Sequence, residues 1–121
     1  MTTTLTPELA DAITAAREAR EAQWTVQYDH VPAPAGATHV HEWQAVHSVT
    51  VPTRYFEGTH RGDLIRVDIN GSQEGDGSVR ERWINVSVAD TRANGLDSAN
   101  IRQGARDMIA AADELDELEG R

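Results

Sequence analysis

The stretch that decides the fold runs from Asp63 to Val88 and reads DLIRVDINGSQEGDGSVRERWINVSV. Its first part, residues 63–70, alternates apolar with polar side chains, the pattern of a strand with one buried face. The apolar positions of this strand are Ile65, Val67 and Ile69.

A turn and a second strand follow. Residues 71–78 are rich in Gly, Ser and Asp, and the pair Asp76-Gly77 suits a turn with positive φ. Residues 79–88 alternate again, with Trp83 on one face and three apolar side chains on the other. The pattern predicts an antiparallel hairpin with an eight-residue loop. The three apolar side chains are Ile84, Val86 and Val88.

A helix is predicted on each side of this hairpin. Thr6 and Pro7 form a start signal for a helix over residues 7–23, whose apolar stripe is narrow and consists mostly of alanine. We therefore expect this helix to dock loosely. Asp97 or Ser98 caps the closing helix, which runs towards Glu117. Its apolar stripe packs on the sheet or serves as a self-association seam; the stripe comprises Ile101, Ala105, Met108, Ala112 and Leu115, widened by Ile109 and Leu118.

The remaining segments complete the expected topology. Residues 24–28 alternate as a short strand, residues 29–38 form a loop, and residues 46–51 form a strand that Pro52 ends. The sequence thus predicts an α+β fold, a three- to four-stranded antiparallel sheet flanked by an N-terminal and a C-terminal helix. The whole chain, 1–121, forms one small domain, compact over about 44–118.

Composition limits what this domain does. Among 121 residues only 23 are Leu, Ile, Val or Phe, which predicts a thin core. The net charge of -9, without any lysine, disfavours direct binding to nucleic acid or to anionic membranes. The chain has no cysteine, which excludes disulfides and thiolate chemistry, and the N-terminus lacks the pattern of a signal peptide, so we expect a cytoplasmic protein.

The histidines lie close together in the sequence, all five between positions 30 and 60. In an extended strand His39, His41 and His47 share one face, and three imidazoles there could hold Zn²⁺. Two alternatives stay open: the histidines are solvated or packing side chains, or they respond to pH. No catalytic residue and no cofactor is expected.

The end of the closing helix is strongly acidic, with Asp113, Glu114, Asp116 and Glu117 within five positions. Such a segment is either a solvated face or a surface that attracts a basic partner protein. We expect these four carboxylates to be the partner-binding residues.

Several short motifs together resemble a group of small actinobacterial and actinophage domains of unknown function. They are Trp24, Asp29-His30, His39 or His47, Val49-Thr50-Val51, Trp83-Ile84-Asn85-Val86 and the segment Ala105 to Leu115. The resemblance covers about residues 24–118. Such domains often carry a cysteine after the tryptophan, where this chain has Thr25. The resemblance implies no particular activity.

These observations favour a non-enzymatic, acidic protein-interaction module, encoded by a phage or mobile element as an accessory protein. Its partner is an unidentified protein, and a homodimer is an option because a thin core gains from association. Two alternatives remain: a DNA mimic that inhibits a nucleic-acid-binding protein, and a histidine-based metal-binding protein.

Overall fold

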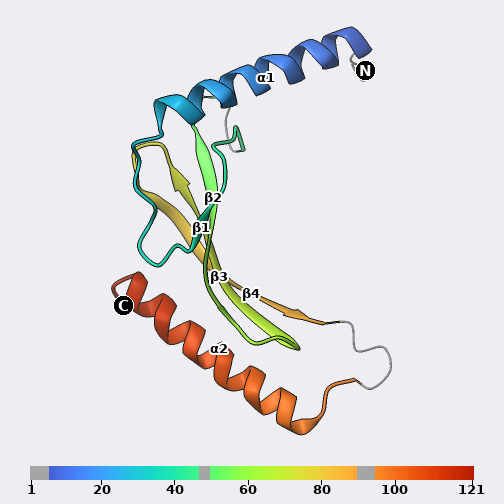
Figure 1. Cartoon of the computed structure of the whole chain (residues 1–121), viewed down its shortest axis with the longest axis vertical. Helices are drawn as coiled ribbons and strands as arrows, with labels where there is room; N and C mark the ends of the chain where they lie inside the picture. Colours follow the sequence, from blue (N-terminus) through green and yellow to red (C-terminus); the bar gives the residue numbers. More distant parts are fainter. Residues whose placement is uncertain (1–5, 47–49, 90–94) are drawn as a thin grey trace, which may run out of the picture.

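A computed structural model describes residues 6–46, 50–89 and 95–121, and it has the predicted α+β architecture (Figure 1). Four strands form one antiparallel sheet in the order β1-β2-β3-β4, with a helix before and a helix after them. The elements are α1 (Pro7–Gln27), β1 (His39–Val40), β2 (Thr53–Arg61), β3 (Ile65–Glu74), β4 (Val79–Val88) and α2 (Ser98–Leu118).

The hairpin of β3 and β4 is confirmed, but its loop is shorter than predicted. Strand β3 continues to Glu74, so that residues 75–78 alone make the turn, with Gly77 at φ 93°. Gly71 lies within this strand, and a glycine is needed there because the Phe56 ring occupies the space that a side chain would take. The eight-residue loop was therefore wrong, since the glycine serves close packing and not a turn.

Strand β2 was not predicted. Residues 46–51 were expected to form a strand; residues 47–49 lie outside the described residues, and Thr50 and Val51 belong to no strand. Pro52 precedes a strand and does not end one. The segment 53–61 lacks clear alternation because its first two residues, Thr53 and Arg54, are both buried and both polar.

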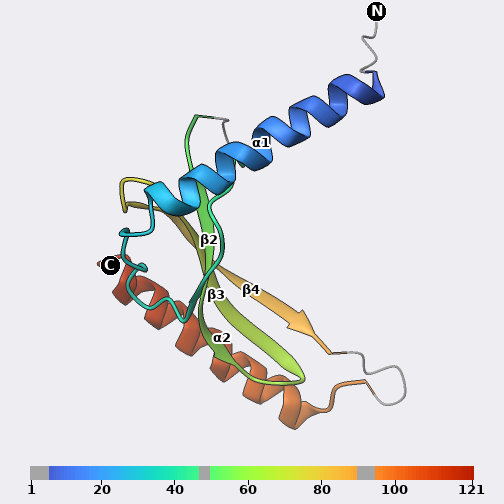
Figure 2. The ribbon, with the colours of Figure 1, turned by 45° about the horizontal axis from the view of Figure 1, so that its top comes forward.

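Residues 24–28 are not a strand, because α1 continues through Gln27. The helical spacing places Trp24 and Tyr28 together, and both pack against Trp43 in a small cluster that also includes Val31. Trp24 is the one residue of α1 that is buried, and the earlier turns project away from the sheet (Figure 2). Leu9 and Ile13 consequently remain about half exposed.

Helix α2 covers one face of the sheet. Asp97, one of the two predicted candidates, is its N-cap and forms a capping box with Asn100. The centre of its buried face is Gly104 and Ala111, and Ala111 packs into the core. The expected apolar stripe is displaced to one side of this centre, so that most of its residues stay exposed. The core consists of Ile65, Val67, Ile69 and Ala111, with Ile84, Leu96 and Leu115 packed against it.

Neither described helix has a segment long and apolar enough to cross a membrane.

Candidate functional site

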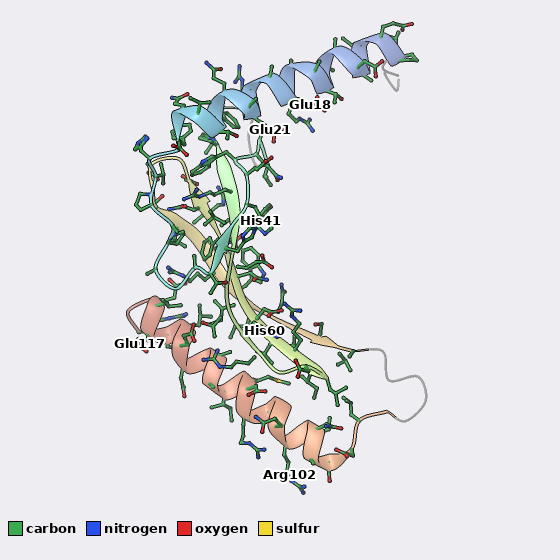
Figure 3. All side chains as sticks on the ribbon, in the orientation of Figure 1. Glu18, Glu21, His41, His60, Arg102 and Glu117 are labelled. Carbon is green, nitrogen blue, oxygen red and sulfur yellow. The ribbon has the colours of Figure 1, made fainter. Side chains whose placement is uncertain are left out.

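The sheet face opposite α2 is open and polar. Alternation along β3 turns Arg66 and Asp68 to this face, while Val67 points into the core. His60 of β2 joins them, with its Nδ1 2.8 Å from Asp68 Oδ1, and Arg66 Nε donates to Asp68 Oδ2 at 2.9 Å. Figure 3 labels His60 and, further along the same sheet, His41. The open face therefore presents histidine and carboxylate side chains that come from different strands of the sheet.

A histidine-carboxylate cluster lies at the β1 end of this sheet. His39 of β1 is directly opposite Glu57 of β2, and His41 follows two residues later. The rings of His39 and His41 meet edge to face with centroids 4.7 Å apart, and His41 Nε2 is 3.3 Å from Glu57 Oε2. One ligand atom from each of the three side chains lies within 4.8 Å of the others, and all three residues are exposed.

The structure thus brings together two of the three histidines expected to share a site, while His47 lies outside the described residues. The third member, Glu57, was missed because its position depends on the unpredicted strand β2. Tyr55, Phe56 and Thr59 are good strand formers and were the available signal for that strand.

Beside the cluster is an open depression of about 400 Å³, whose lining includes Asp29, His39, His41 and Trp43. At its base Arg54 is almost fully buried, with its guanidinium carbon 4.5 Å above the Trp43 ring. Burial lowers the pKa of Arg54 from its ordinary value.

Arg54 joins the sheet to the loop between α1 and β1. Its Nε donates to Gln73 Oε1 at 2.7 Å, and its Nη2 donates to the carbonyls of Val31 at 3.0 Å and Pro32 at 3.2 Å. Because these acceptors lie on β3 and on the loop, Arg54 sets where the chain enters β1.

The acidic end of α2 does not form a uniform surface. Glu114 turns inward, where Thr59 Oγ1 donates to its Oε2 at 2.6 Å and Arg61 Nη2 to its Oε1 at 2.7 Å. The Thr59 hydroxyl, followed by Arg61, lowers the pKa of Glu114. Asp113, Asp116 and Glu117 are all exposed, and Asp116 lies 3.6 Å from Arg121.

The opposite edge of the sheet is apolar. β4 is the outermost strand, and no other described strand pairs with its outer edge. Val86 and Val88 are 49% and 56% exposed, although they lie on the face that α2 covers. Ile101 and Met108, on the neighbouring flank of α2, are 51% and 37% exposed. Together these four residues form a surface that we call the β4 strip.

In comparisons with known proteins, no family model, no curated protein and no solved structure matches this chain. What the molecule does is therefore inferred from its two features of chemical interest, the histidine-carboxylate cluster and the β4 strip.

Proposed function

We propose that the protein is a non-enzymatic interaction module and that it pairs with a second copy of itself through β4. The observation that carries this proposal is the β4 strip, an apolar surface beside an unpaired strand edge. Soluble proteins usually protect long edge strands with charges, proline or a bulge. The segment Ile84–Val88 has neither a charge nor a proline.

The hydrogen bonds of β4 show which backbone groups are available. The N–H of Ala89 donates to the Leu64 carbonyl at 2.8 Å, on the β3 side. In an antiparallel pair the residues alternate between those that bond to the neighbour and those that face away. The N–H and C=O groups of Ile84, Val86 and Val88 therefore point to the open edge.

The segment Ile84–Val88 can pair with the same segment of a second copy. If two copies pair antiparallel about Val86, then Ile84 of each copy lies opposite Val88 of the other. Every side chain on the α2-covered face of this pairing is then aliphatic. Burying the exposed part of the two valines in each copy contributes on the order of 1 kcal/mol per side chain. Ile101 and Met108 of α2 overhang the same strip and extend the contact.

The pairing leaves the acidic outer surface of α2 accessible. Asp113 and Glu117 face solvent, away from β4, and a chain of net charge -9 steers basic proteins towards such a surface. The self-paired module would therefore present two acidic helices to a basic partner protein.

Sedimentation of the V86R variant tests the pairing. We expect the unaltered protein to sediment as a dimer at micromolar concentration and V86R as a folded monomer, because two arginines would be opposed at the centre of the contact. The matched control is V26R, since Val26 is 79% exposed on α1 and is not part of the β4 strip. A monomeric unaltered protein, or a V86R variant that dimerises like V26R, would refute the pairing.

The register is tested by cross-linking, because the chain has no cysteine of its own. Opposed residues of a hydrogen-bonded pair have Cα atoms about 5.5 Å apart, within the range of a disulfide. V86C should therefore form a disulfide-linked dimer on mild oxidation, whereas I84C alone should not. Mixing I84C with V88C should restore the link, and efficient cross-linking of I84C alone would contradict the register.

A further inference from the structure

We infer that His39, His41 and Glu57 bind one divalent transition-metal ion, and that Zn²⁺ is the ion they fit best. This site lies at the β1 end of the sheet and is independent of the self-pairing proposed for β4. Two imidazoles and a carboxylate are a known ligand set for zinc, with the fourth position left to water.

The distances suit such an ion. Two ligand atoms that are each about 2.0–2.1 Å from a tetrahedral zinc lie about 3.3 Å from one another. His41 Nε2 and Glu57 Oε2 are already 3.3 Å apart. A ring nitrogen of His39 is within 4.8 Å of both, and this exposed side chain can close the remaining distance by a small rotation.

The backbone holds the three residues in place. The N–H of Thr38 donates to the Glu57 carbonyl at 2.8 Å, and the N–H of His41 donates to the Tyr55 carbonyl at 2.9 Å. These two bonds bracket the pairing of His39 with Glu57 on both sides. The Thr38 hydroxyl also lies 3.2 Å from the Glu57 carbonyl. Binding therefore requires ordering of side chains only, which lowers its entropic cost.

A second histidine-carboxylate pair on the sheet, His60 with Asp68, lacks the features that make the His39–His41–Glu57 cluster a metal site. His60 and Asp68 are 2.8 Å apart, but Arg66 Nε donates to the same carboxylate at 2.9 Å. The guanidinium occupies that carboxylate and repels a cation, and the pair belongs to no group of three ligands among the described residues. His60 is thus a matched control within the same protein.

The ligand types also restrict the ion. Imidazole favours zinc, nickel and copper, whereas calcium and magnesium prefer oxygen ligands. Since the chain has no cysteine, no thiolate competes for zinc. The open position adjoins the depression of about 400 Å³ beside Trp43, which leaves room for water.

Isothermal titration calorimetry of the untagged protein with zinc chloride tests the site. We expect saturation at one ion per chain and at least a tenfold loss of affinity in H39N, H41N and E57Q. The control H60N should bind as the unaltered protein does. The assignment would be overturned if the double variant H39N/H41N still bound one zinc ion per chain, or if H60N lost as much affinity for zinc as the three site variants. It would also be overturned if the unaltered protein showed no saturable binding.

Nuclear magnetic resonance of the imidazole nitrogens supplies a readout that names the ligands. Zinc should shift the ring signals of His39 and His41 and leave those of His60 in place, while calcium chloride should shift none of them. Repeating the zinc titration with V86R separates the two proposals. Zinc should bind V86R with unchanged affinity, because the metal site does not depend on self-pairing through β4.

Discussion

Replacing Arg54 by methionine should destabilise the protein strongly, because this buried guanidinium joins three parts of the chain. It bonds to Gln73 on β3 and to the carbonyls of Val31 and Pro32 in the loop before β1. Methionine fills most of the volume and rests on Trp43, but it donates no hydrogen bond. The substitution therefore removes the hydrogen bonds while keeping much of the packing.

The magnitude follows from the acceptors that are left without a donor. Gln73 Oε1 and the Val31 carbonyl lose their bonds to Arg54, whereas the Pro32 carbonyl still receives Gln73 Nε2 at 3.0 Å. Two orphaned buried acceptors cost about 1–3 kcal/mol each, and the lost contact of the cation with Trp43 adds about 1 kcal/mol. Methionine avoids the desolvation that lowers the pKa of Arg54, which offsets part of this loss. We expect a net decrease of about 3–4 kcal/mol in the free energy of unfolding.

Urea unfolding monitored by tryptophan fluorescence measures this change, since Trp24 and Trp43 are buried. The slope of free energy against urea should be the same in both proteins, so that the midpoint alone shifts. R54K should lose about 2 kcal/mol, because a single ammonium cannot replace the planar, forked donor group.

Two outcomes would refute this reasoning. If R54K were as stable as the unaltered protein, positive charge alone would account for the role of Arg54. If R54M lost less than about 1 kcal/mol, the loop would not depend on these bonds. A double-mutant cycle with Q73L should also show coupling of about 1 kcal/mol or more, because the two side chains are in direct contact.

Two further substitutions probe how α2 docks. In G104A the new methyl carbon would lie 2.6 Å from Ile65 Cδ1 and 3.1 Å from its Cβ, so overpacking of about 1–3 kcal/mol should exceed the gain of about 1 kcal/mol in helix propensity. Thermal unfolding should show a lower Tm, and a higher one would mean that α2 does not rest on Ile65. E114Q should lose about 1 kcal/mol at pH 7 by weakening the bonds with Thr59 and Arg61. Because the native pKa of Glu114 is lowered, its stabilising effect is complete above the ordinary glutamate pKa of about 4.3 and disappears as the pH falls through the native value. Urea midpoints of the two proteins should therefore converge in acid, and a difference that persists there would contradict the role of the charge.

Local patterns in the sequence were sufficient for the pairing of two strands in the hairpin and for the existence of α2, but not for the length of the hairpin loop. Alternation over residues 65–69 and 79–88 identifies strands because one face must be buried, and a strand signals this through its immediate neighbours. The N-cap of α2 is equally local, since Asp97 and Asn100 satisfy each other's backbone groups within one turn. These signals need no knowledge of the rest of the chain.

Only the tertiary structure decided β2, the end of α1 and the histidine-carboxylate cluster. Arg54 is a charged residue in a buried position, and its hydrogen bond to Gln73, a residue distant in sequence, makes this burial possible. Trp24 continues a helix because Trp43 lies beside it, which overrides the strand-like alternation of its neighbours. Glu57 comes to His39 through the β1–β2 pairing. The sequence alone determined elements whose partners are close in the chain, whereas the site depends on contacts between segments whose pairing carries no local signature.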